Sequence, residues 1–192
     1  MREVLELYQV GGKPDGRVIF WQIDEKGRVR SGKVMKYRAN GHRAKKTDGT
    51  LEYGALTWEH AILKKAGKLP DDWQLEQCAF GAHLAPEAVK ENKPVIVVES
   101  EKNAIAGACA FPQFVWISVG GKDFLKRSLL LPFKGCKIQA IPDLGATEKW
   151  RELVGRLQDE FNIFVSDILE KRATPKAIEG RMDIADYLAG EF

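Results

Sequence analysis

Residues 93–102, with the sequence KPVIVVESEK, combine an apolar β-branched run with an abrupt change to charged residues. The run from Val95 to Val98 predicts a strand buried on both faces, and the residues after it predict the start of a helix. Glu99 therefore stands at the carboxyl end of a strand, which is where open α/β sheets place their ligand sites. This stretch predicts an α/β fold with a functional site at Glu99.

A second strand of this kind lies further along the chain. Residues 136–142, CKIQAIP, form a short apolar run that leads into Asp143, and a helical pattern follows. Because the carboxyl ends of parallel strands meet at one edge of a sheet, we expect Glu99 and Asp143 to lie close together. Two carboxylates are suitable ligands for a divalent metal, so the sequence predicts a site for Mg²⁺ or Mn²⁺.

The composition excludes several classes of protein. The chain has 192 residues, of which 44% are hydrophobic and 30% charged, as in ordinary globular proteins. It contains no apolar run of the roughly 18 residues that span a bilayer, and no signal-peptide core at its start, so we expect a cytoplasmic protein with no membrane partner. The odd number and wide spacing of Cys78, Cys109 and Cys136 predict reduced core thiols, and isolated His42 and His60 predict structural or solvent-facing roles.

The net charge of +3 is unevenly distributed. Residues 26–46 contain nine Lys or Arg and no acid, so a polyanion could bind there; the alternative is the solvated face of a hairpin. Three aromatic residues are interleaved with this segment and could stack on the bases of a single strand, although core positions are the usual fate of such residues. They are Trp21, Tyr37 and Trp58, and the candidate phosphate contacts are Lys33, Lys36, Arg38 and Arg43.

The pattern of apolar and polar residues changes near the middle of the chain. Residues 1–67 alternate β-like runs with glycine turns and predict a basic, antiparallel α+β subdomain; residues 68–93 read as a connector, and residues 94–192 as an α/β domain with a mostly parallel sheet flanked by helices. In the N-terminal half we expect strands at 17–23 and 28–37 and a helix at 57–65 capped by Thr57, followed in the connector by a short helix near 86–90. In the C-terminal half we expect strands at 95–98, 114–119, 137–141 and 162–165. The helices expected there are 101–110, 124–130, 147–161 and 184–188.

Four motifs together resemble a Toprim domain, the metal-binding fold shared by bacterial-type primases and topoisomerases. They are residues 95–104 (VIVVESEKNA), 119–121 (VGG), 141–143 (IPD) and 182–188 (MDIADYL), and the match spans about residues 94–190. In that family a Glu after the first strand and an Asp-x-Asp after a later strand place magnesium for nucleotidyl transfer. The resemblance implies these roles for Glu99 and Asp143. Asp183 is a further candidate metal ligand, with Asp186 and Asp167 as alternatives to it.

The N-terminal half is similar to the primase branch of that family. Residues 20–33 resemble the basic segment that precedes Toprim in primase-like proteins of phages and mobilisable elements, where it helps to hold template and nucleotides. Trp58, His60 and residues 77–81 and 142–146 are similar to Toprim-like proteins of mobile elements. The resemblance implies a primase core acting on single-stranded DNA and nucleoside triphosphates, with a helicase or mobilisation protein as a further candidate partner. Lys102 and Lys122 are then further candidate phosphate contacts.

Three positions depart from the family pattern. Gly145 stands where the second acid of Asp-x-Asp is usual, Ser100 replaces the glycine after the first Glu, and Asn103 replaces an Asp of the following helix. These changes leave a two-metal scheme short of ligands. Two alternatives to the primase therefore stay open. One is a Toprim nuclease, which would use the same metal to activate water, and the other is a catalytically degenerate module that binds nucleic acid or a replication partner.

Overall fold

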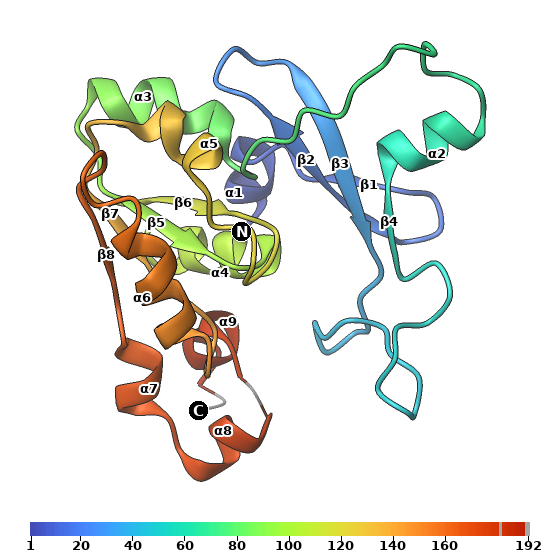
Figure 1. Cartoon of the computed structure of the whole chain (residues 1–192). Helices are drawn as coiled ribbons and strands as arrows, with labels where there is room; N and C mark the ends of the chain where they lie inside the picture. The colour runs from blue at the N-terminus through green and yellow to red at the C-terminus, as the bar shows by residue number, and fades with distance from the viewer. Residues whose placement is uncertain (181, 191–192) are drawn as a thin grey trace.

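The computed structural model describes residues 1–180 and 182–190, which form two four-stranded sheets that lie side by side (Figure 1). The N-terminal sheet is antiparallel, with the strand order β1-β2-β3-β4. The C-terminal sheet is parallel, with the order β6-β5-β7-β8, and helices flank it. This architecture confirms the predicted fold class.

The N-terminal sheet is built around a β-hairpin. Strands β2 and β3 pair from Val18↔Met35 onward, and the turn between them places Gly27 at a φ of +76°, which glycine adopts without strain. The Asp24 side chain closes this turn by accepting the backbone N–H groups of Lys26 and Arg28. The elements of this unit are α1 (Arg2–Leu7), β1 (Gly11–Gly12), β2 (Val18–Ile23), β3 (Val29–Met35), β4 (Leu56–Trp58) and α2 (Glu59–Lys65).

The parallel sheet places β5 and β7 next to each other at its centre, with Val97 opposite Ala140. Both strands run the same way, so the residues that follow them emerge at one edge. Figure 1 shows α7, α8 and α9 beyond one end of this sheet. Its elements are β5 (Val95–Val98), α4 (Glu101–Ala110), β6 (Val115–Ser118), α5 (Arg127–Leu130), η2 (Leu131–Phe133), β7 (Ile138–Ala140), α6 (Thr147–Gly155), β8 (Ile163–Val165), α7 (Ile168–Arg172), α8 (Pro175–Gly180) and α9 (Ile184–Leu188), preceded by η1 (Ala82–Leu84) and α3 (Ala85–Lys90).

Three expected helix boundaries were wrong. Thr57 does not cap α2, because it belongs to β4 and pairs with Val34, so the helix begins two residues later. The helix expected from 124 begins at Arg127 and tightens into η2 at Pro132. Helix α6 ends at Gly155, and the apolar residues that extended the expected helix are buried by turns instead, as at Leu157 and Phe161.

The two units share one apolar core. Phe20 and Met35 of the N-terminal sheet pack in the same buried cluster as Ile96 and Val98 of β5. Tyr8 adds a polar link, because its Oη donates to the Trp116 carbonyl at 2.8 Å and accepts from the Trp116 N–H at 3.1 Å. None of the helices in the described part of the chain is long and apolar enough to cross a membrane. The division at residues 67 and 94 remains a prediction, since buried contacts cross it.

Candidate functional site

Glu99 and Asp143 lie side by side at the carboxyl edge of the parallel sheet. Glu99 directly follows β5, and Asp143 comes three residues after the end of β7. The backbone N–H of Asp143 donates a hydrogen bond to Glu99 Oε1 at 3.2 Å. Glu99 is only 8% exposed, so the two acids form a largely desolvated pair at the edge where the sequence predicts a site.

The surroundings of the pair oppose its full ionisation. Burial raises the pKa of Glu99, although the hydrogen bond from Asp143 and several nearby cations act against the shift. The pKa of Asp143 rises to about 8, first because the carboxyl is buried and then because Glu99 and Asp183 add negative charge. Arg43 and Lys102 lower the pKa of Asp143 but do not cancel these effects. A bound cation would relieve this excess of negative charge.

Asn103 completes the immediate surroundings of Asp143. Its side chain is fully buried, and its Nδ2 donates to Asp143 Oδ1 at 2.9 Å. Helix α4 is fixed at this point by Ser100, whose Oγ accepts the Asn103 backbone N–H at 3.3 Å as an N-cap. Within the described part of the chain, the Asn103 Oδ1 atom is buried without a hydrogen-bond partner. The asparagine thus gives Asp143 a neutral donor where the Toprim resemblance predicts an acid.

Asp183 lines the same pocket, but its carboxylate is already engaged. It caps α9 by accepting the N–H groups of Ala185 and Asp186 at 3.0 and 3.1 Å. Its other oxygen lies 3.2 Å from Lys102 Nζ, which also pairs with Asp186 at 3.3 Å. Across residues 1–180 and 182–190, no three His, Cys, Asp or Glu side chains are grouped so as to hold a metal ion. A metal role for Asp183 therefore remains a prediction.

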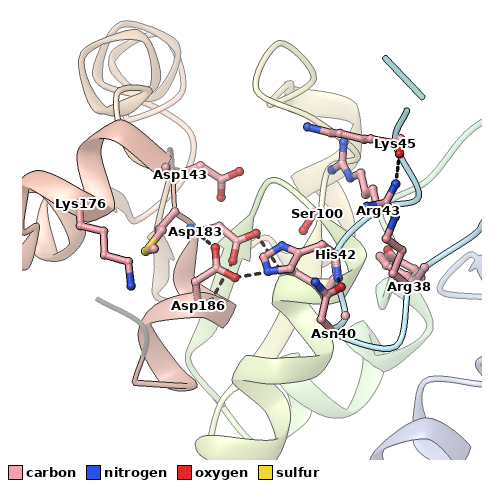
Figure 2. Close-up of a pocket in the computed structure, with 15 residues that line it drawn as sticks. Arg38, Asn40, His42, Arg43, Lys45, Ser100, Asp143, Lys176, Asp183 and Asp186 are labelled. Carbon is pink, nitrogen blue, oxygen red and sulfur yellow. Dashed lines mark hydrogen bonds and ion pairs between the residues drawn. The ribbon is translucent and has the colours of Figure 1, made fainter. Parts of the chain in front are cut away.

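A pocket of about 670 Å³ is lined by Asp143, Asp183 and Asp186, whereas Glu99 is not among its lining residues. Figure 2 shows Asp143, Asp183 and Asp186 on one side of it, and residues of the loop between β3 and β4 on the other. We call this loop, residues 38–45, the basic loop. Its members that line the pocket are Arg38, Asn40, Gly41, His42, Arg43 and Lys45, and Lys176 of α8 lines it as well.

The expected phosphate contacts differ in how free they are. Lys36 and Arg38 both pair with Glu52, at 3.1 and 3.6 Å. Arg43 is exposed and lines the pocket, and its charge lowers the pKa of both Glu99 and Asp143. No ion pair involves Arg43 within the described residues. Lys122 is also exposed, and its charge acts on Glu99. Among the expected phosphate contacts, Arg43 and Lys122 are exposed, and their charges act on the acid pair.

Lys33 departs from its expected role as a contact for nucleic acid. It is buried, and its Nζ lies 2.9 Å from Glu101 Oε2. The reason is its position in β3, where it pairs with Phe20 on the side of the sheet that packs against the C-terminal unit. Lys33 has no exposed ammonium to offer a phosphate, so this expectation was wrong for Lys33.

The residues present fit one divalent cation of the kind that the family resemblance implies. Two carboxylates are held together in spite of their mutual repulsion, which is the arrangement in which a cation stabilises both. Mg²⁺ is commonly bound by one or two carboxylates, with water and substrate phosphates as its other ligands. Glu99 and Asp143 could hold such an ion together.

Sequence reasoning overlooked several residues of the pocket. Asn40 and Lys45 lie in or beside the basic run, and their neighbours in that run were the only available signal. His42 was expected to have a structural or solvent-facing role; it is exposed and lines the pocket wall. Lys176 gave no signal, because it enters the pocket from a helix that the sequence pattern did not predict.

The fold is that of bacterial-type primase catalytic cores. The primase fragment of the bacteriophage T7 primase-helicase protein matches with a TM-score of 0.57 at 16% identity, over 98% of this chain and 66% of that one, just under two thirds of its length. The DnaG catalytic core matches with a TM-score of 0.54 at 15% identity, over 100% and 72%. The Aquifex aeolicus primase, with its zinc-binding and RNA polymerase domains, matches at 0.50 and 15%, over 92% and 44%.

The sequence also assigns the chain to a family. The family described as "Domain of unknown function (DUF6371)" matches residues 1–144, so the chain belongs to it. The matched region contains both acids of the pair and the whole basic loop. No protein of curated function matches the chain.

Proposed function

We propose that this protein is a primase-type nucleotidyltransferase of the Toprim class, which joins nucleotides on a single-stranded DNA template with Mg²⁺ or Mn²⁺ as its cofactor. The likeness of its fold to primase catalytic cores supports this proposal. The observation that carries it is the contact between Glu99 and Asp143, because Asp143 lines a pocket whose opposite wall is the basic loop. Acidic side chains that could bind a cation therefore face basic side chains that could bind phosphates.

Each residue of the site has a role in this proposal. Glu99 and Asp143 would hold the metal, which would supply positive charge to the triphosphate and the attacking hydroxyl. The hydrogen bond from the Asp143 amide to Oε1 holds the Glu99 carboxylate in position beside Asp143. Arg43 and Lys122 orient the phosphates through charge-assisted hydrogen bonds.

The partners in this proposal follow from the same site. Single-stranded DNA and nucleoside triphosphates are the polyanions that the basic loop would bind. Membership of a mobile element or phage, and a helicase or mobilisation protein as a partner, rest on the sequence resemblance alone. The proposed unit boundaries, near residues 67 and 94, separate the basic unit from the acidic site.

Primer synthesis tests the proposal directly. The full chain is incubated with single-stranded DNA, all four ribonucleotides or deoxyribonucleotides, and Mg²⁺ or Mn²⁺, and the products are resolved by size. We expect metal-dependent products from the wild type and none from Glu99→Gln or Asp143→Asn. Glu152→Gln and Asp159→Asn, which remove exposed acids, should keep the activity. If the wild-type protein binds metal and DNA but makes no product, the proposal that it is a primase is refuted.

One alternative is supported by a specific observation. Asn103 and Gly145 replace acids of the family pattern, and the carboxylate of Asp183 is engaged by Lys102 and by its own helix. A site reduced in this way could bind nucleic acid without catalysis. In that case Glu99→Gln would leave DNA affinity unchanged and no metal-dependent step would be seen. Metal-dependent shortening of the DNA in the same assay would instead identify a Toprim nuclease.

A further inference from the structure

Lys33 links the two units through a buried ion pair close to the acid pair. Its Nζ donates to Glu101 Oε2 at 2.9 Å, to Glu101 Oε1 at 3.2 Å and to the Gly120 carbonyl at 3.4 Å. The side chains of Lys33 and Glu101 are 8% and 3% exposed. The three contacts match the three N–H donors of an ammonium group.

These contacts lead to Glu99 by two routes. Glu101 is the first residue of α4 and lies two residues after Glu99 in the chain. On the other route, the Gly120 N–H donates to Ser118 Oγ at 3.1 Å, and that hydroxyl donates to the Glu99 carbonyl at 3.1 Å. Lys33, from the N-terminal sheet, therefore contacts the Glu101 side chain and the Gly120 carbonyl, each of which is linked to Glu99.

Stability alone does not account for this arrangement. A buried ion pair loses much of its Coulombic attraction to desolvation, and a well-packed apolar pair of similar volume commonly stabilises a fold as well or better. An apolar pair could not donate a hydrogen bond to the Gly120 carbonyl, however. Gly120, whose N–H donates to Ser118 Oγ, would then lose its contact with the N-terminal sheet. Lys33 differs from an apolar side chain because its ammonium group donates to both Glu101 and the Gly120 carbonyl.

We propose that Lys33 is a positioning residue, which acts through Glu101, Gly120 and Ser118 to hold Glu99 beside Asp143. For the role of Glu99 this inference rests on the proposed function, but the contacts themselves do not. It deepens that function by making the N-terminal unit part of the acidic site, in addition to providing the basic wall of the pocket.

A double substitution separates positioning from packing. Lys33→Met alone would leave Glu101 buried and unpaired, so the variant of choice is Lys33→Met/Glu101→Met, which removes both charges and keeps the volume. We expect a melting temperature close to that of the wild type, with Mn²⁺ affinity, measured by calorimetry, weaker by about 10- to 100-fold. A double variant with wild-type melting temperature and wild-type Mn²⁺ affinity would overturn the proposal.

Ser118→Ala removes the hydrogen bonds between Gly120, Ser118 and Glu99 but leaves the Lys33–Glu101 ion pair intact. It therefore tests the proposal even if the double variant does not fold. The hydroxyl links Gly120 to Glu99, and its loss should weaken Mn²⁺ binding by about tenfold. Ser166→Ala is the control, because Ser166 directly follows β8 of the same sheet and, among the described residues, its Oγ hydrogen-bonds to the Ile168 N–H alone. Equal Mn²⁺ affinities of the two serine variants would contradict the inference.

Hydrogen exchange separates failure of this inference from failure of the proposed function. The Asp143 amide is bonded to the Glu99 carboxylate, so its exchange rate reports where the Glu99 side chain lies. If the wild type binds no Mn²⁺, the proposed metal site is wrong, and the exchange experiment still tests Lys33. Faster exchange at Asp143 and Gly120 in the double variant, with β8 unchanged, supports the inference. Exchange at wild-type rates at both amides overturns it.

Discussion

Asn103 donates a hydrogen bond from Nδ2 to Asp143 Oδ1 over 2.9 Å, from a helix to the end of a neighbouring strand. The amide is neutral, so it supports the carboxylate without adding to the negative charge of the site. An aspartate at this position would lose the N–H donor and bring a third carboxylate against Asp143. An asparagine at position 103 therefore limits the negative charge next to Asp143.

We therefore predict that Asn103→Asp destabilises the metal-free protein and strengthens metal binding. The loss of one hydrogen bond and the added repulsion should cost about 1–3 kcal/mol of unfolding free energy at pH 8, measured in urea with a chelator present. Saturating Mn²⁺ should recover most of this loss, because the ion binds only the folded protein. An Asn103→Asp variant as stable as the wild type in chelator would show that this contact is unimportant.

The raised pKa of Asp143 predicts a pH dependence of stability. The folded state holds the Asp143 proton up to about pH 8, while the unfolded chain releases it near pH 4. This contribution is complete below pH 4 and is lost as the pH rises to 8, because the folded state binds the proton more tightly. Asp143→Asn should thus be more stable than the wild type at pH 8, by about 1–3 kcal/mol in chelator, and equal to it at pH 4.

The control for this experiment is Asp159→Asn, which removes an exposed acid elsewhere. Its unfolding free energy should follow that of the wild type at every pH. If Asp143→Asn has the same pH profile as Asp159→Asn, the carboxyl at 143 is not desolvated and the description of the acid pair is wrong.

Arg43 should contribute to nucleic-acid binding through its charge. Its guanidinium lines the pocket and has no ion-pair partner among the described residues, so a phosphate can pair with it without displacing an acid. Arg43→Gln should weaken single-stranded DNA binding and lower the slope of log affinity against log salt by about 0.7, measured by fluorescence anisotropy. Arg156→Gln, an exposed arginine outside the pocket, is the control. Identical salt slopes for the two variants would remove Arg43 from the interface.

The sequence was informative where a feature depends on local pattern and on parallel topology. The run from Val95 to Val98 predicts the central strand, and the shared edge of parallel strands brings Glu99 and Asp143 together across 44 residues of chain. The fold class and most strands followed from such patterns. The helix at Thr57 was misplaced because cross-strand pairing with Val34 outweighed its capping preference.

The burial of Lys33 and its pairing with Glu101 could not be predicted from its neighbours in the sequence. In the printed sequence it is one of nine cations in a run, and it is indistinguishable from Lys36 by charge or local pattern. Its partner, Glu101, lies 68 residues further on and becomes a partner only when the two sheets pack together. The same holds for Asn103, whose contact with Asp143 depends on how α4 lies against the end of β7.

Tyr8 provides a test of how firmly the two units are joined. Its hydroxyl both donates to and accepts from the backbone of Trp116, which belongs to an edge strand of the parallel sheet. Tyr8→Phe should lower the unfolding free energy by about 1–3 kcal/mol, because two buried backbone groups lose a partner. Tyr53→Phe is the matched control, since Tyr53 is fully exposed. Equal stabilities of the two variants would show that the Tyr8 link adds nothing.

The central claim is that Glu99 and Asp143 share one divalent cation. The most direct measurement is a crystal structure of the full chain soaked in Mn²⁺, with data collected at the manganese absorption edge. We expect an anomalous peak between the two carboxylates, and its loss in crystals of Glu99→Gln. An anomalous peak elsewhere alone, or none at the acid pair at saturating Mn²⁺, would show that Glu99 and Asp143 do not share a cation.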